Sequence, residues 1–332
     1  MLAYRLRANH LGGDRLPTGS LALAARSGLQ DGSPRSALLS LAARVKGVGR
    51  CDWQADELAQ VFGPRGAVYV VPADDVGVFT LGLLPRSPAR VAELEEAARQ
   101  VHEVLGGAPM RQADVVAALP ELGGTRGLRW ASTLGTLVAT WDTVDTIVHP
   151  APAPTIAPEK ARLELARRFF EYLGPATVKD LQWWLDGSRT DATETLAALG
   201  DDLVPVVVEG WERFVLASSL PCLGPSPDPD LVQLLPPDDV YINRLHRHLL
   251  VRDPEKQKLL WPQAPPPGAL VIGGEMRGTW RRRGATVTIT PWDEVQNRYR
   301  ESAEAIVARW PLVDRTNAPV GGSPTALWSD PA

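Results

Sequence analysis

The segment 159–222 carries turn and cap signals that restrict it to very few small folds. One amphipathic helix is expected at its start, and two shorter helices are expected after Thr177 and Ser188. Both residues suit the N-cap position, where a side-chain oxygen accepts a hydrogen bond from the first helical turn. Two β-rich runs follow, separated by Glu209-Gly210, which predicts a hairpin. Helices followed by a hairpin are the order of a winged-helix unit.

The same order of elements is expected twice earlier in the chain, over 10–85 and 88–150. In the second segment, a long amphipathic helix and two short helices precede a hairpin. In the first segment, Ser33 suits an N-cap and Pro34 the first helical position. The elements expected there are helices over 21–30, 34–45 and 52–62 and strands over 67–72 and 76–84. The sequence therefore predicts three tandem winged-helix units.

The remainder of the chain has a different character. Residues 231–293 contain β-rich runs separated by glycine turns, which predicts a small β-rich domain. Residues 294–310 have a helical pattern, and the Gly/Pro/Ser-rich residues 311–332 are expected to form a flexible tail. The fold class expected for the whole chain is α+β.

The charge of the chain is unevenly distributed. The net charge is −4, but residues 241–283 hold nine Lys or Arg and three acidic residues, a local charge of +6. The rest of the chain carries −10. A basic face on an acidic protein can steer a polyanion, although a solvated charged surface has the same composition. The distribution therefore keeps nucleic acid among the candidate partners.

Composition also argues against several classes of protein. No apolar run approaches the roughly 20 residues that span a bilayer, and the first residues lack a signal-peptide pattern, so a cytoplasmic location is expected. Cys51 and Cys222 are the only cysteines, which argues against a disulfide scaffold or a cysteine zinc site. His246 and His248 form an isolated His-x-His pair, a weak metal signal. No metal and no cofactor are expected.

Five stretches of the chain carry a resemblance to a known family. They are GLQDGSPRSALLSLAARV (28–45), YLGPATVKDLQWWL (172–185), LLPPDDVYI (234–242), DPEKQKLLW (253–261) and GTWR (278–281). In this order they resemble the winged-helix DNA glycosylase family that includes AlkZ and YcaQ. The resemblance covers about residues 10–295 and implies tandem winged helices with a β-barrel-like domain, arranged around duplex DNA. It also implies cleavage of the N-glycosidic bond of alkylated purines, including bulky adducts and interstrand crosslinks.

The catalytic motif of the family, Gln-x-Gln or Gln-x-Asp, corresponds to Gln30 onward. In this chain the third position is Gly32, and the carboxylate lies one residue earlier, at Asp31. A carboxylate can deprotonate a water, and a glutamine can hold it by hydrogen bonds, so Gln30 and Asp31 are the predicted catalytic pair. Alternatively, Asp31 pairs with Arg35 or interacts with the next helix, and Gln30 satisfies backbone groups in the turn.

The predicted DNA contacts are arginines and one histidine, because a guanidinium donates two parallel hydrogen bonds to a phosphate. Arg35 follows the motif directly, and the others lie in the basic segment. The full set is Arg35, Arg244, His246, Arg247, Arg281, Arg282 and Arg283.

The leading hypothesis is a monomeric, monofunctional DNA glycosylase that acts on alkylated or damaged purines in double-stranded DNA. No lysine lies beside the motif, and Lys46 is far along the following helix, which argues against a lyase. One alternative is a non-catalytic winged-helix DNA-binding protein, a regulator or damage sensor. Another is a protein-interaction scaffold, because winged-helix units also mediate protein contacts.

Overall fold

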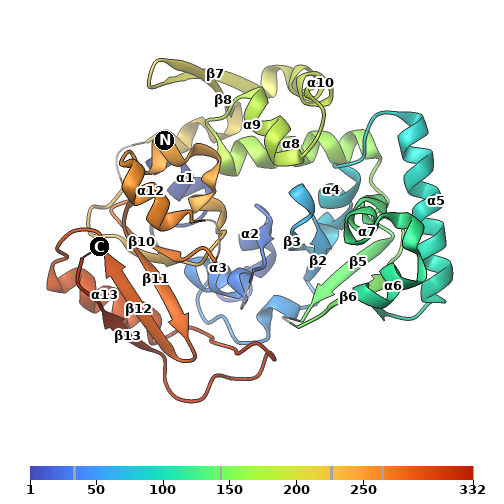
Figure 1. Ribbon diagram of the computed structural model, residues 1–332. Helices are drawn as coiled ribbons and strands as arrows, with labels where there is room; N and C mark the ends of the chain where they lie inside the picture. Colours follow the sequence, from blue (N-terminus) through green and yellow to red (C-terminus); the bar gives the residue numbers. More distant parts are fainter. Residues whose placement is uncertain (33–34, 143, 225–226, 263–264, 332) are drawn as a thin grey trace. The chain divides into compact units, whose positions relative to one another are not determined.

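The structure is a computed structural model that describes residues 1–32, 35–142, 144–224, 227–262 and 265–331. Contacts between residues divide the chain into two compact units. Unit 1 consists of Met1–Ala24, Leu29–Trp53 and Ser219–Ala332, and unit 2 consists of Ala25–Gly28 and Gln54–Ser218. Both combine helices with antiparallel strands, so the fold is α+β (Figure 1).

Unit 1 is built on a five-stranded sheet in the order β13-β12-β11-β10-β9. Neighbouring strands are antiparallel except for β12 and β13, which are parallel. The strands of this sheet are β9 Val232–Leu235, β10 Gly268–Ile272, β11 Glu275–Arg283, β12 Thr286–Pro291 and β13 Thr325–Trp328. The other elements are α1 Leu2–Ala8, α2 Leu21–Ala25, β1 Leu29–Gln30, α3 Ser36–Arg44, α11 Arg247–Leu250, α12 Pro254–Leu260 and α13 Asn297–Val307.

The main core of unit 1 forms where α13 packs against the sheet. Trp280 on β11 is buried there, and its indole Nε1 donates to the Leu235 carbonyl at 2.9 Å. A Cβ on Gly268 would lie 2.1 Å from the Trp280 ring, so this close approach of strand and indole requires glycine. Leu39 of α3 joins the same core, which attaches the helix after the motif to the sheet.

Unit 2 contains helices interspersed with antiparallel hairpins, β2–β3, β5–β6 and β7–β8. Strand β4 pairs with the outer side of β6. The helices are α4 Val76–Leu81, α5 Pro88–Leu105, α6 Gln112–Ala118, α7 Thr125–Ala131, α8 Pro158–Leu173, α9 Val178–Leu185 and α10 Arg189–Leu199. The strands are β2 Leu58–Phe62, β3 Val68–Pro72, β4 Met110–Arg111, β5 Leu137–Trp141, β6 Thr146–Pro150, β7 Leu203–Val208 and β8 Trp211–Leu216.

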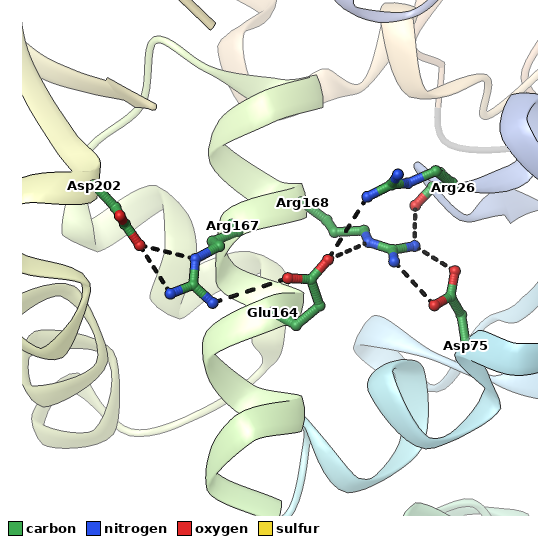
Figure 2. Close-up of polar contacts among 6 residues, drawn as sticks. All are labelled: Arg26, Asp75, Glu164, Arg167, Arg168 and Asp202. Atoms are coloured by element: carbon green, nitrogen blue, oxygen red, sulfur yellow. Dashed lines mark hydrogen bonds and ion pairs between the residues drawn. The ribbon is translucent and has the colours of Figure 1, made fainter. Parts of the chain in front are cut away.

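Helix α8 is tied to its surroundings in unit 2 by a network of ion pairs (Figure 2). The Arg168 guanidinium makes two hydrogen bonds to Asp75, at 2.6 and 2.9 Å, and a third to Glu164 at 3.0 Å. It also donates to the Arg26 carbonyl at 3.0 Å. One turn of α8 therefore connects segments that are distant in sequence.

The predicted elements of segments 88–150 and 159–222 are confirmed. Thr177 caps α9 in a capping box, in which its hydroxyl accepts from the Asp180 amide and the Asp180 carboxylate accepts from the Thr177 amide. Ser188 caps α10 by accepting from the Asp191 amide. Three helices and a hairpin follow one another here as the sequence predicts.

Three elements of the first segment differ from the prediction. The helix expected over 21–30 covers only Leu21–Ala25, and Leu29–Gln30 is strand β1. Residues 52–62 do not form a helix: a short 3-10 turn at Asp52–Gln54 leads into strand β2, which pairs with β3. Residues 76–84 do not form a strand, because Val76–Leu81 is helix α4. Gly77 to Leu81 are all buried, so the run is apolar on every side and lacks the period that separates helix from strand.

Two further expectations concern the tail and the start of α3. The predicted flexible tail contains β13, which extends the sheet of unit 1. The predicted cap Ser33 and helix start Pro34 lie outside the described residues; α3 is described from Ser36, after Arg35 in a left-handed conformation. Over the described ranges, no helix combines the length and the apolar character needed to cross a membrane.

Candidate active site and nucleic-acid interface

The motif segment of unit 1 alternates between buried and accessible side chains. Leu29 is 1% exposed and Asp31 is buried, whereas Gln30 and Gly32 are partly exposed. This is the pattern of extended backbone, in which successive residues point in opposite directions. Gln30 and Gly32 therefore share the accessible face, and Asp31 points into the protein.

Asp31 is enclosed in an ion pair with Arg35. Its Oδ2 lies 2.7 Å from Arg35 Nη1, and the side chains of Asp31 and Arg35 are 0% and 1% exposed. The other carboxylate oxygen accepts from the backbone amide of Ala37 at 3.1 Å, in the first turn of α3. Asp31 thus makes both of the structural contacts given above as alternatives to catalysis: it pairs with Arg35, and it accepts a hydrogen bond from the next helix. With both oxygens engaged, Asp31 has no accessible atom to offer a nucleotide.

Arg35 is held on three sides within unit 1. Besides Asp31, its Nε donates to Asn317 Oδ1 at 2.8 Å, and its guanidinium lies 3.4 Å from the centre of the Trp53 ring. The prediction that Arg35 binds a phosphate is corrected, because a side chain enclosed by protein groups does not reach the surface. Its role in the structure is to join the motif segment to the 313–318 loop.

The other end of α3 is anchored by a second buried ion pair. Arg44 makes two hydrogen bonds to Asp239, at 2.8 and 2.9 Å, and Ser40 donates to the same carboxylate at 2.5 Å. The Tyr241 amide donates to its other oxygen at 3.0 Å. Burial favours the protonated form of Asp239, but the charge of Arg44 and these hydrogen bonds outweigh it and lower the pKa of the carboxyl. The turn that carries Asp239 is thereby fixed against α3.

Asp238, the neighbour of Asp239, lies beside Gly32. A Cβ placed on Gly32 would lie 3.6 Å from Asp238 Oδ2 and 3.4 Å from Ser36 Oγ. Asp238 has a positive φ of 63° and an exposed side chain. The protein groups around it raise the pKa of its carboxyl by desolvation, and the positive charge of Arg244 opposes the shift. Sequence reasoning missed Asp238 because the contact spans about two hundred residues.

The arginines at the end of β11 do not all point the same way. Arg281 and Arg283 are exposed on one face of β11, whereas Arg282 alternates to the other face. Arg282 donates to the Val313 carbonyl at 2.8 Å, and its pKa is lowered mainly by burial. The three arginines predicted to bind DNA therefore divide into two accessible side chains and one that supports the 313–318 loop.

The second basic group, near residue 246, is also divided. Arg244 and Arg247 are exposed, but His246 is 1% exposed and its Nδ1 contacts the guanidinium of the buried Arg5. The prediction that His246 contacts DNA is corrected, because the side chain is packed in the interior. Among the described residues, no three His, Cys, Asp or Glu side chains are grouped to hold a metal ion.

Unit 2 contains a cavity of about 320 Å³ that the sequence did not reveal. Arg65, Arg126 and Arg129 line it, together with Phe62 and Trp130, and Asp186 also reaches it. In the part of the chain that the structure describes, none of these three arginines forms an ion pair, and Arg129 Nε is buried without a hydrogen-bond partner. The arginines come from two segments that are distant in sequence, so no local cluster of charged residues in the sequence indicates the cavity.

The chain belongs to the AlkZ-like DNA glycosylase family, because the sequence profile described as "DNA glycosylase AlkZ-like" matches residues 23–310. Membership makes the protein a glycosylase of DNA repair, a hydrolase of N-glycosyl bonds whose partner is DNA. Among solved structures, the fold is similar to Streptomyces sahachiroi DNA glycosylase AlkZ, with a TM-score of 0.75 and 19% identity. The similarity covers 99% of this chain and 98% of that one. No curated protein matched the sequence.

Proposed function

We propose that this protein is a monofunctional DNA glycosylase that hydrolyses the N-glycosidic bond of N-alkylated purines in duplex DNA, in base-excision or crosslink repair. The observation that carries the proposal is the placement of Gln30 between two buried neighbours, Leu29 and Asp31, with its own side chain accessible. A side chain on such an anchored segment can orient a water with little loss of conformational freedom. Family membership supplies the reaction class.

Hydrolysis of an N-alkylated purine does not require an acid that protonates the leaving base, and the candidate site shows no obvious acid for that role. A purine alkylated at N7 or N3 is cationic, so the electron pair of the broken bond neutralises it and no proton is needed. The developing positive charge on the sugar and the placement of the water remain for the enzyme to manage. The Gln30 amide can accept from and donate to that water, although it cannot act as a base near neutral pH.

A lyase reaction is not part of the proposal. A lyase needs an amine that attacks C1′, and Lys46 is the lysine closest in sequence to the motif. Lys46 follows the C-terminal end of α3, so the whole helix Ser36–Arg44 separates it from the motif segment. The expected product is therefore an abasic site with an intact strand.

Exposed arginines are the proposed phosphate contacts. In unit 1 these are Arg244, Arg247, Arg281 and Arg283, which the structure leaves accessible. In unit 2 the proposed contacts are the arginines of the cavity, whose guanidinium groups lack acidic partners among the described residues. We also propose that residues 159–222, with their three helices and hairpin, act as a winged-helix unit and that the protein works as a monomer.

The test is release of base from a defined duplex. The protein is incubated with DNA containing one N7-methylguanine, and abasic sites are revealed by alkaline strand cleavage. We expect cleavage after alkali, none without it, and a rate about 100-fold lower for Gln30→Ala, comparable to the effect of removing one positioned hydrogen-bond donor. Absence of abasic sites with the wild-type protein, across N7- and N3-methylated purines, would contradict the proposed substrate class.

A further inference from the structure

Hydrolysis at C1′ leaves one requirement unmet by the motif itself. The attacking water must lose a proton, and a carboxylate is the ordinary acceptor at neutral pH. Gln30 has no basic atom, and Asp31 is enclosed with both oxygens engaged by Arg35 and Ala37. Gly32, the other accessible position of the segment, has no side chain at all. A carboxylate that serves as the acceptor would therefore have to come from outside the motif segment.

The space beside Gly32 already contains one. Gly32 shares the accessible face with Gln30, and a side chain at position 32 would begin 3.6 Å from Asp238 Oδ2. This separation is ordinary van der Waals contact, so a side chain at position 32 would begin directly beside the Asp238 carboxylate. The motif has no side chain at Gly32, and the carboxylate of Asp238 lies beside that position.

The turn that carries Asp238 is anchored through Asp239, and its conformation is unusual. Asp239 is fixed to α3 by hydrogen bonds from Arg44 and Ser40, so the position of its neighbour is set by the same helix that follows the motif. Asp238 has a φ of 63°, a conformation that most side chains avoid and that Asp and Asn tolerate best. Such outliers persist where the surroundings determine them, often at functional sites.

Asp238 also differs from its neighbours in having unused oxygens. Within the described residues it forms no ion pair and no hydrogen bond through its carboxylate, whereas Asp31 and Asp239 are both fully engaged. Arg244 is the charged group that acts on it. Its side chain is exposed, so the carboxylate is accessible to water.

We propose that Asp238 is the catalytic base of this glycosylase and accepts the proton of the water that Gln30 orients. The inference rests on the proposed function of the Gln30 segment. Desolvation by the surrounding protein groups raises the pKa of the Asp238 carboxyl, which strengthens it as a proton acceptor.

The atoms of the step balance. The water oxygen forms a bond to C1′ as the bond between C1′ and the purine nitrogen breaks. The electron pair of the broken bond goes to the cationic N-alkyl purine, which leaves neutral. The proton of the water passes to a carboxylate oxygen of Asp238 and from there to solvent. The products are an abasic sugar, the free base and one proton.

The test compares Asp238→Asn with Asp14→Asn, an exposed aspartate of the same unit, by single-turnover release of N7-methylguanine. Asparagine keeps the left-handed backbone, so the fold is expected to survive, which circular dichroism and unchanged DNA affinity confirm. We expect a rate about 100-fold lower for Asp238→Asn and an unchanged rate for Asp14→Asn. Full activity of Asp238→Asn beside an active wild type would overturn this inference while leaving the proposed function intact.

A second variant separates catalysis from a structural role. In the double variant Gly32→Asp with Asp238→Asn, the carboxylate moves to the adjacent place, and Gly32 has no positive φ that would strain the new residue. We expect base release to recover at least about tenfold over Asp238→Asn. No recovery, with DNA affinity intact, counts against a base at this position. A wild type that releases no base overturns both proposals.

Discussion

Arg44 and Asp239 lie 195 residues apart in sequence and are joined by two hydrogen bonds of 2.8 and 2.9 Å in the interior of unit 1. Neither side chain is more than 1% exposed. The pair attaches the end of α3 to the turn that follows β9. Because the motif segment precedes α3 and Asp238 lies in that turn, the geometry of the candidate site depends on this pair.

The Asp239→Asn variant is expected to be less stable than wild type by about 3–5 kcal/mol, because it leaves the Arg44 charge buried without its counter-charge. Urea denaturation measures the difference. Asp230→Asn, which alters an exposed ion pair with Arg298, is the matched control and is expected to change stability little. Equal destabilisation of the two variants would contradict a special role for the buried pair.

The stability difference between the wild type and Asp239→Asn is expected to depend on pH. The pKa of Asp239 is lower in the folded protein than its ordinary value of about 3.9. A depressed carboxyl contributes stability that is fully present above the unfolded pKa and is lost as the pH falls through the folded pKa. The stability gap between wild type and Asp239→Asn should therefore be constant from about pH 5 to 7 and shrink below about pH 4. A gap that widens in acid would contradict the assignment.

Arg35 and Asp31 should behave as a coupled pair. Arg35→Met is expected to cost about 3–5 kcal/mol of stability, since it leaves the Asp31 carboxylate buried and unpaired. Adding Asp31→Asn removes that charge and keeps an acceptor for the Ala37 amide, so the double variant should be more stable than Arg35→Met alone. Additive effects in urea denaturation would show that the two side chains do not depend on each other.

Arg281 and Arg283 are expected to bind DNA through phosphates. Replacing both with glutamine should weaken binding to all duplex sequences alike and reduce the slope of log K against log salt by about 0.9 for each phosphate that is no longer neutralised. Fluorescence anisotropy over a salt series measures this. Arg99→Gln is the control, because Arg99 is paired with Glu96 and Glu103 on an exposed helix. An unchanged slope would show that Arg281 and Arg283 of β11 do not contact DNA phosphates.

The arginine-lined cavity of unit 2 leads to a separate prediction. Arg126→Gln with Arg129→Gln should lower DNA affinity and reduce the salt slope, because both guanidinium groups lack acidic partners among the described residues. Stability should change little, since no ion pair is broken. The measurement is the same salt series, again with Arg99→Gln as control. Wild-type affinity in the double variant would show that the cavity takes no part in binding DNA.

Much of the fold was predictable where local signals were strong. The caps Thr177 and Ser188 and the long helix α5 announce themselves through side-chain chemistry and helical period. Helix α4 was missed because its residues are buried on all sides, which removes the period. Strand β2 was missed because its conformation depends on pairing with β3, an interaction that single-residue preferences do not carry.

The candidate site was predictable only in part. Gln30 could be located from the motif, but the direction of Asp31 depends on Arg35, Trp53 and Asn317, which enclose the pair. His246 looks like a surface residue in a basic run, yet it packs against Arg5 from the other end of the chain. Asp238 had no sequence signal, because its relation to Gly32 exists only after β9 and α3 come together.

The chain path of unit 1 has a consequence for synthesis. Gln30 is translated before unit 2, whereas Asp239 and Asn317, which fix its surroundings, belong to the segment Ser219–Ala332 that is translated after unit 2. Unit 2 is almost entirely one continuous stretch and needs no such delay. A nascent chain halted after residue 218 therefore carries the motif segment but lacks Asp239 and Asn317, so unit 1 cannot complete these contacts until the segment after unit 2 has been made.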